Sequence, residues 1–234
     1  MRRILCLCLI FLVGCTSNWA PVNDAGGYVQ LSGQHIVQPG ETLYSIGWRY
    51  NRDYKELAQA NDIQPPYKIY VGQKISLEEK ESKPPPQVQQ PQTQTVSVAK
   101  TVAPQPAPPV AQTTALGPWQ WPVKGAIIGR FAQTKGLDIA GVEGELIHAA
   151  GAGQVVYSGT GLRGYGQLLI IKHNEQYLSA YAHNKKLLVK EGVQVKIGQA
   201  IAQMGNTDTN RVKLHFEIRH NGKPVDPLRY LPKG

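Results

Sequence analysis

The chain has few cysteines, and all three lie within its first 15 residues. From residue 16 to residue 234 there is no thiol, which excludes a disulfide framework and thiol catalysis in that part of the chain. Long apolar runs are also scarce. Residues 4–13 form an apolar stretch of ten residues, which is too short to cross a bilayer as a helix but has the length of a signal-peptide core.

The residues around this stretch predict a lipid anchor. Met1-Arg2-Arg3 supplies a basic start, and Leu12-Val13-Gly14-Cys15 resembles a bacterial lipobox, in which the chain is cleaved before a lipidated cysteine. The resemblance implies a signal peptide over 1–14, a lipid on Cys15 and stable membrane attachment. Thr16, rather than aspartate, favours the outer membrane, with the protein facing the periplasm. The alternative is an ordinary secreted protein in which the cysteine is fortuitous.

The net charge of +9 is unevenly placed along the chain. Residues 28–78 hold five Lys/Arg and five Asp/Glu, whereas residues 117–234 hold fifteen and eight, a net of +7. A basic domain indicates an anionic partner, and in the periplasm peptidoglycan or an acidic protein is a better candidate than nucleic acid. A solvated basic surface without a specific partner is the alternative.

Two segments lack the periodicity of a folded core. Residues 79–116 are rich in proline and glutamine, and Lys100 is the only charged residue from 84 to 116. This composition predicts a disordered linker, which at about 3.1 Å per residue could reach on the order of 100 Å. Residues 15–33 form a second predicted flexible tether, between the lipid and the first domain.

Residues 34–78 predict a small α+β domain with βααβ order. Residues 36–37 begin a strand, and residues 69–77 are predicted to form a closing strand. Thr42 is suited to cap a first helix and Asp53 to cap a second. The segment resembles a LysM module over its whole length. The matching residues are His35-Ile36-Val37, Gly40-Glu41-Thr42-Leu43, Ile46, Leu57, Asn61, Ile63, Ile69 and Val71-Gly72-Gln73-Lys74-Ile75.

The LysM resemblance implies binding of N-acetylglucosamine-containing glycans. The family's groove lies between the first strand–helix loop and the second helix–strand loop. Structural roles explain several of the residues there equally well: Gly40 in a turn, Leu43 in the core and Asn61 at a helix end. The candidate glycan-binding residues are Gly40, Glu41, Thr42, Leu43, Asn61, Ile63 and Pro65.

Residues 117–234 predict an antiparallel β domain. Short apolar runs at 126–131, 154–157, 168–171 and 177–181 are bounded by Gly or Asn. The segment resembles the LytM/lysostaphin family of zinc endopeptidases, which cut cell-wall peptides. The resemblance is carried by Gly136-Leu137-Asp138-Ile139-Ala140, Gly151-Ala152-Gly153-Gln154-Val155, Tyr165-Gly166, Tyr181-Ala182-His183, Gly192, Gly198-Gln199 and Leu214-His215-Phe216-Glu217-Ile218.

Two positions depart from the pattern of that family. The family's zinc ligands fall on Thr134, where histidine is expected, and on Asp138 and His215, which are retained. Its two catalytic histidines fall on His183, which is retained, and on Lys213. A hydroxyl is a poor zinc ligand and an ammonium repels a dication, so we expect no metal cofactor and no peptidase activity. We predict that Lys213 instead forms a salt bridge with Asp138.

Strand alternation predicts the two faces of this groove. Lys213, His215, Glu217 and Arg219 share one face, and Tyr177, Ser179, Tyr181 and His183 share a face on their strand. No other histidine has obvious ligand spacing: His148 is expected on the strand after Asp138, His173 at a strand end and His220 in an exposed hairpin.

The combination of lipobox, LysM module, Pro/Gln linker and degenerate LytM domain resembles NlpD-type outer-membrane lipoproteins. That family activates periplasmic N-acetylmuramoyl-L-alanine amidases, which split septal peptidoglycan during cell division. The alternatives are an active endopeptidase with an unusual ligand set and a passive tether between wall and membrane. The candidate partner-binding residues are Asp138, Arg163, Tyr181, His183, Lys213 and His215.

Overall fold

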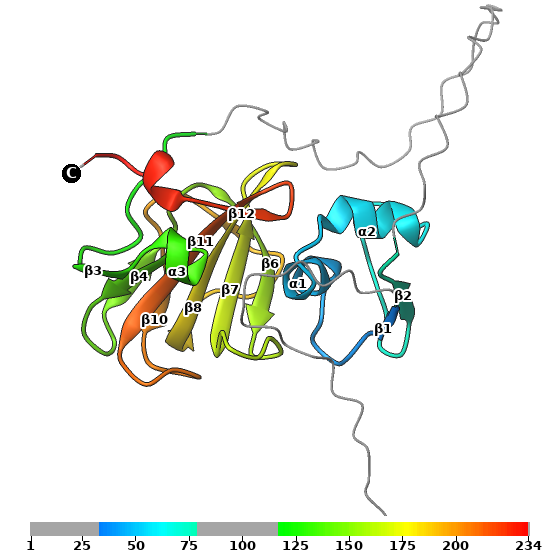
Figure 1. The fold of residues 1–234 in the computed structure, drawn as a ribbon, viewed down its shortest axis with the longest axis horizontal. Coiled ribbons are helices and arrows are strands. Elements are labelled where there is room, and N and C mark those ends of the chain that lie inside the picture. Colours follow the sequence, from blue (N-terminus) through cyan, green and yellow to red (C-terminus); the bar gives the residue numbers. More distant parts are fainter. Residues whose placement is uncertain (1–32, 79–116, 234) are drawn as a thin grey trace, which may run out of the picture. The chain divides into compact units, whose positions relative to one another are not determined.

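A computed structural model describes residues 33–78 and 117–233 (Figure 1). The predicted signal peptide, the lipidated Cys15, the tether up to residue 32 and the linker over 79–116 lie outside the described residues. No helix in the two described segments is both long enough and apolar enough to cross a membrane.

The first segment has the expected βααβ order, and both helices begin at the predicted caps. The Thr42 side chain accepts a hydrogen bond from the Ser45 amide, and the Asp53 carboxylate accepts one from the Lys55 amide. The closing strand is shorter than predicted, because residues 69–73 are not in strand conformation and the Gln73 amide instead closes a turn on the Tyr70 carbonyl. The elements are β1 (Gln34–Ile36), α1 (Leu43–Arg49), α2 (Tyr54–Ala60) and β2 (Lys74–Ser76), with β1 antiparallel to β2.

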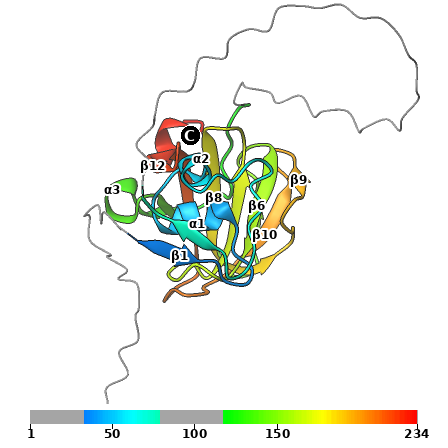
Figure 2. The ribbon, with the colours of Figure 1, turned by 90° about the vertical axis from the view of Figure 1, so that its right-hand side faces the viewer.

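The second segment is an antiparallel sheet, as predicted. Its hydrogen-bonded path runs β3-β4-β11-β8-β7-β6-β9, so β8 and β11 are interior strands (Figure 1 and Figure 2). The elements are β3 (Ile127–Gly129), α3 (Phe131–Thr134), β4 (Leu137–Ala140), β5 (Leu146–His148), β6 (Gly153–Gly159), β7 (Gln167–Lys172), β8 (Tyr177–Leu187), β9 (Gln194–Val195), β10 (Ala200–Met204), β11 (Lys213–His220), β12 (Lys223–Val225) and the 3₁₀ turn η1 (Pro227–Arg229).

One face of the interior strands forms the core. Phe216 of β11 lies opposite Tyr181 of β8, their rings are 5.3 Å apart, and both side chains are fully buried. The first predicted strand is wrong at its end, because Phe131 begins the short helix α3 rather than continuing β3. This helix carries Thr134 to the start of β4 and so forms one border of the groove.

Candidate functional site

The groove is built on two adjacent strands, β4 and β11. Their register places His215 directly opposite Asp138 and Lys213 opposite Ala140. Since strand side chains alternate, the even-numbered residues of β11 enter the apolar core, and Lys213 and His215 rise from the other face. The sheet therefore holds Asp138, His215 and Lys213 together without any loop contributing to their position.

Lys213 and Asp138 form the salt bridge that we predicted. The Lys213 Nζ lies 2.7 Å from Asp138 Oδ2, and the His215 Nδ1 lies 2.7 Å from the other oxygen, Oδ1. Asp138 is 8% exposed and His215 also 8%. Both carboxylate oxygens are thus already occupied by positively charged or hydrogen-bonding groups of the chain itself.

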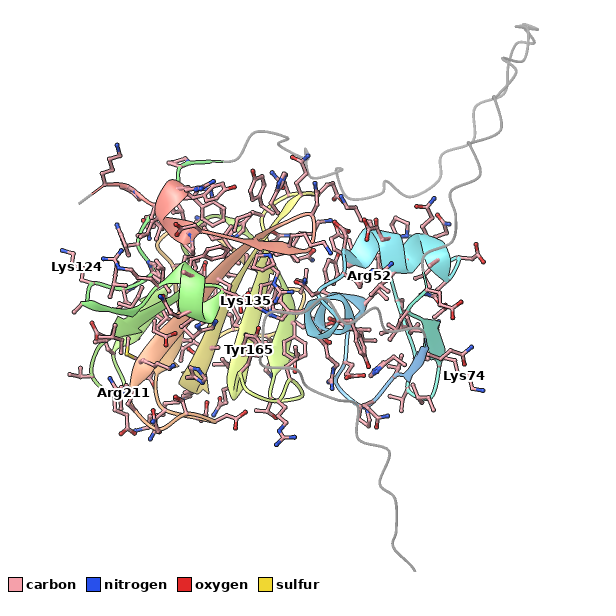
Figure 3. The ribbon with its side chains drawn as sticks, in the orientation of Figure 1. Arg52, Lys74, Lys124, Lys135, Tyr165 and Arg211 are labelled. Atoms are coloured by element: carbon pink, nitrogen blue, oxygen red, sulfur yellow. The ribbon has the colours of Figure 1, made fainter. Side chains whose placement is uncertain are left out.

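A second buried carboxylate continues this network along β11. Glu217 Oε1 lies 3.1 Å from His215 Nε2 and accepts a 2.8 Å hydrogen bond from the hydroxyl of Tyr165, which is labelled in Figure 3. Its Oε2 accepts a hydrogen bond from Arg219 Nε at 3.2 Å. Glu217 and Arg219 are 1% and 4% exposed, so this charged face of β11 is as buried as its apolar face.

The charges in this network stabilise one another. Burial alone would lower the pKa of His215, but its hydrogen bonds to Asp138 and Glu217 prevail and raise that pKa to about 9. Burial would raise the pKa of Asp138, yet hydrogen bonds from His215 and Lys213 hold it at about 2. The pKa of Glu217 is likewise lowered to about 2, against its burial, mainly by the charge of Arg219. At neutral pH His215 is therefore an imidazolium, which has no lone pair for a metal.

These pKa shifts predict a stability that falls in alkali. His215 has its pKa raised from 6.5 to about 9, so its contribution is complete below pH 6.5 and is lost as the pH rises through about 9. The contributions of Asp138 and Glu217 are present above their unfolded values of 3.8 and 4.5, and are lost only as the pH falls toward about 2. Urea denaturation from pH 6 to pH 10 should show this decline. A His215→Gln variant should lack it, and an unchanged slope in that variant would contradict the assignment.

His183 reaches the groove by a route that alternation did not predict. The pairing of β7 with β8 shifts register between Gln167 and Leu169, and His183 has a positive φ of 62°. This bulge turns the His183 side chain to the groove face, where its ring lies 6.1 Å from that of His215. Its Nδ1 bonds to the Thr207 carbonyl at 2.8 Å.

The same bulge overturns the prediction for Tyr181. This residue does not share a face with His183 but points into the core, where it is fully buried. Its hydroxyl accepts a hydrogen bond from the Ala150 amide at 2.8 Å and one from the Ser179 hydroxyl at 3.0 Å. Tyr181 cannot contact a partner directly, so naming it as a partner-binding residue was wrong.

The groove does not fit the zinc ion of the LytM/lysostaphin family. The Thr134 hydroxyl donates to a backbone carbonyl, with Arg130 O at 3.2 Å and Gly136 O at 3.0 Å. Asp138 is neutralised by Lys213, and His215 is protonated. Within residues 33–78 and 117–233, no three His, Cys, Asp or Glu side chains converge in a way that could hold a metal.

The other histidines of this segment make their contacts outside this network. His148 ends β5, the strand after β4 as expected, and β5 pairs with β10. His173 is buried, which lowers its pKa to about 4, and its Nε2 lies 2.7 Å from the Ser179 hydroxyl. His220 stacks on Tyr177 at 4.6 Å and is half-buried rather than exposed. Arg163 is exposed on the loop between β6 and β7, beside Tyr165.

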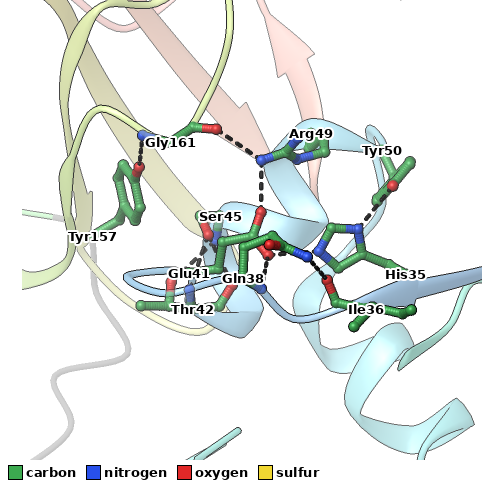
Figure 4. Close-up of polar contacts among 10 residues, drawn as sticks. All are labelled: His35, Ile36, Gln38, Glu41, Thr42, Ser45, Arg49, Tyr50, Tyr157 and Gly161. Atoms are coloured by element: carbon green, nitrogen blue, oxygen red, sulfur yellow. Dashed lines mark hydrogen bonds and ion pairs between the residues drawn. The ribbon is translucent and has the colours of Figure 1, made fainter. Parts of the chain in front are cut away.

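In the LysM segment, the predicted glycan loop is held by a buried carboxylate (Figure 4). Glu41 Oε2 lies 2.6 Å from His35 Nε2 and accepts the Gln38 amide at 2.9 Å, and its Oε1 accepts from Arg49 at 2.6 Å. The Glu41 side chain is only 2% exposed. This carboxylate therefore shapes the loop and leaves the backbone and Thr42 as the groups nearer the surface.

Two other predicted glycan-binding residues have structural roles. Leu43 is fully buried, so its prediction as a direct contact was wrong. The Asn61 amide nitrogen donates to the Leu57 and Ser76 carbonyls, and its oxygen accepts from the Ser76 amide, which ties α2 to β2. Gly40 and Pro65 are exposed and Ile63 is half-buried.

Comparison with known proteins identifies both segments and the chain as a whole. Residues 35–78 match the LysM domain, and residues 132–227 match Peptidase family M23. The chain is 51% identical to the lipoprotein NlpD/LppB homolog of Pseudomonas aeruginosa, over 86% of this chain and 78% of that protein. It belongs to the NlpD family of lipoproteins.

Two further likenesses are to a second NlpD relative and to a solved peptidase structure. The murein hydrolase activator NlpD of Escherichia coli is 38% identical, over 85% of this chain and 68% of that protein. A zinc-containing peptidase from Vibrio cholerae is 30% identical in its solved structure, over 50% of this chain and 41% of that chain, with a TM-score of 0.46. The Lys213–Asp138 ion pair lies within the residues that match Peptidase family M23.

Three residues of this NlpD-family groove were not among the predicted site residues: Tyr165, Glu217 and Arg219. Alternation along β11 already predicted that Glu217 and Arg219 share the face of His215, and two charged residues on that face of an interior strand need partners. Nothing in the spacing of Tyr165 indicated that its hydroxyl reaches Glu217.

Proposed function

We propose that this chain is a peptidoglycan-binding outer-membrane lipoprotein that activates periplasmic N-acetylmuramoyl-L-alanine amidases and has no peptidase activity of its own. The observation that supports the proposal is the ion pair between Lys213 and Asp138, because the resemblance to the peptidase family implies that Asp138 corresponds to one of its metal ligands. Relatives named murein hydrolase activators support it, since their names describe activation of another hydrolase.

The groove serves as a binding surface in this proposal. Arg163 offers positive charge at the surface, and the Lys213 side chain, which is paired with Asp138, is 17% exposed. Asp138, His215 and His183 fix the shape of the groove floor. An amidase that binds here more tightly in its open state than in its inhibited state is shifted toward the open state, which is activation by differential affinity.

In this proposal, attachment to the wall and to the membrane keeps the groove near the peptidoglycan that the amidase cleaves. The LysM segment would bind glycan strands through Gly40, Thr42, Ile63 and Pro65, and a lipid on Cys15 would fix the chain to the outer membrane. Peptidoglycan binding follows the LysM match, whereas outer-membrane attachment follows the lipobox pattern and the lipoprotein names of relatives.

Dye release from labelled peptidoglycan tests the proposal. The chain alone should release no dye, and the chain mixed with an amidase of the same organism should release much more than that amidase alone. Release by the chain alone, abolished by a chelator, would show an active endopeptidase. No stimulation of any amidase would favour the passive tether.

A charge-reversal pair locates the surface. Arg163→Glu should reduce stimulation of the amidase by about tenfold, because an exposed cation on the loop that carries Tyr165, whose hydroxyl bonds Glu217, becomes a repelling anion. Lys124→Glu is the matched control, since Lys124 is equally exposed but precedes β3 (Figure 3). Equal losses in the two variants would show a dependence on net charge alone and would place the binding surface elsewhere.

A further inference from the structure

The His183 ring lies in the groove with one nitrogen bonded and the other bare. Its Nδ1 lies 2.8 Å from the Thr207 carbonyl oxygen, which can only accept, so the ring proton is on Nδ1. Burial lowers the pKa of His183, and the charges of His215 and Lys213 lower it further, so the ring is neutral at pH 7. Nε2 therefore holds a lone pair, and within residues 33–78 and 117–233 no group donates a hydrogen bond to it.

The other ionisable groups on the groove floor already have partners. Both oxygens of Asp138, both ring nitrogens of His215 and both oxygens of Glu217 are engaged by neighbouring side chains of the same domain. His183 is only 5% exposed, so its bare nitrogen has little contact with water. A buried acceptor without a donor is unfavourable, and a ligand that supplies the donor recovers that loss.

Asn184 holds the β8 bulge that turns His183 to the groove. Its Nδ2 donates to the Tyr181 and Gln167 carbonyls, at 2.7 Å each, on either side of the register shift between β7 and β8. Asn184 is fully buried, and its Oδ1 has no partner among the described residues. One atom of this amide is thus left unsatisfied, so the contribution of the side chain to the fold lies in its two bonds to the bulge.

Thr207 fixes the same bulge from the loop between β10 and β11. Its Oγ1 donates to the Asn184 carbonyl at 2.9 Å and accepts from the Gln167 amide at 2.9 Å. Its own carbonyl accepts from His183 Nδ1. A Cβ added at Gly166 would overlap both the Oγ1 and the carbonyl of Thr207, so the loop packs closely on the β7 side of the bulge. One residue therefore sets both the backbone and the ring orientation of His183.

We propose that Asn184 and Thr207 are positioning residues that hold His183 with its Nε2 facing the groove, and that the amidase segment which enters the groove donates a hydrogen bond to that nitrogen. The second part rests on the function proposed above, whereas the first does not.

The charges around His183 define the chemistry of the donor. A carboxylate has no proton to donate. An ammonium or guanidinium would be repelled by Lys213 and by the imidazolium of His215, whose ring lies 6.1 Å from that of His183. The donor is therefore an uncharged N–H or O–H group, namely a hydroxyl, a backbone amide or a carboxamide.

Nitrogen-15 NMR of the histidine rings in the full chain tests the positioning. His183 should show a protonated Nδ1 and a bare Nε2, and its signals are assigned by their loss in His183→Gln. Thr207→Val removes both hydrogen bonds of the hydroxyl, so the proton should spread over the two nitrogens and their chemical shifts should approach each other. Thr207→Ser keeps the hydroxyl and should retain the original pattern. Thr209→Val is the matched control, because Thr209 lies on the same loop and makes only a backbone hydrogen bond among the described residues.

Isothermal titration with the amidase that the chain stimulates tests the hydrogen bond to Nε2. His183→Leu removes the acceptor and should weaken binding about tenfold, because the donor of the amidase is then buried without a partner. His183→Gln supplies an amide oxygen at a similar reach and should recover most of the affinity.

Each result decides a separate part of the proposal. Unchanged nitrogen shifts in Thr207→Val overturn the positioning role. Equal affinities of His183→Leu and the unaltered chain overturn the donated hydrogen bond, while the amidase function stands. If no amidase binds the unaltered chain, the proposed function and the hydrogen bond both fail, and the NMR result still decides the positioning. Should Thr207→Val not fold, Thr207→Ala removes the same hydroxyl without adding an apolar group and should give the same change in shifts.

Discussion

Replacing Glu217 by alanine is expected to lower the free energy of unfolding by about 3–5 kcal/mol, the range for removing one partner of a buried ion pair. Glu217 is 1% exposed and lies between the imidazolium of His215 and the guanidinium of Arg219. Without it, both cations stay buried beside each other, and the Tyr165 hydroxyl loses its acceptor. Desolvation of unpaired charge, rather than loss of attraction alone, makes the effect large.

Chemical denaturation of the variant and of a matched control measures this effect. Glu143→Ala also removes one carboxylate from an ion pair, with Lys185 at 2.9 Å, but both side chains there are more than half exposed. We expect that control to change stability by less than about 1 kcal/mol. Similar values for the two variants would mean that the groove network contributes no more than a surface pair.

Restoring the two histidines is expected to restore zinc binding. In a Thr134→His, Lys213→His variant, position 134, Asp138 and His215 would supply the three protein ligands that such a site needs. Removing the ammonium also frees Asp138 Oδ2, and a zinc ion that binds there displaces the proton from His215, as metal binding to a protonated ligand does. Structural and catalytic zinc sites of this type bind at well below micromolar concentration.

Isothermal titration and metal analysis after dialysis give the readout, with one zinc per chain expected. Lys124→His, Lys190→His adds the same number of histidines at exposed positions and should retain none. The single variant Lys213→His should bind weakly, since Thr134 still directs its hydroxyl to backbone carbonyls. A double variant without zinc would contradict the correspondence of these positions to the peptidase site.

Much of the fold followed from local patterns. Thr42 and Asp53 cap helices because short acceptor side chains bond free amides, which is a property of neighbouring residues and can be read from sequence. The salt bridge of Lys213 with Asp138 was also predictable, since an ammonium and a carboxylate that face each other on adjacent strands attract one another. The end of β3 was not predictable from sequence. Phenylalanine favours strands, and Phe131 is helical here only because it begins the short helix α3.

The remaining site residues depended on long-range geometry. A register shift in β8 separates Tyr181 from His183, and alternation alone assigns both to one face. The sequence placed Glu41 in a surface loop. In the structure, its carboxylate is bonded by His35 and Arg49, six and eight positions away.

Lys213 also makes the shape of the groove independent of the supply of metal ions. A bound ion can be removed by competing chelators or by scarcity, and a groove built around one changes shape when it leaves. Here the balancing cation is attached to the backbone of β11, so it cannot diffuse away. We therefore expect this surface to keep the same form when zinc is withheld from the cell, even as enzymes that rely on that metal lose theirs.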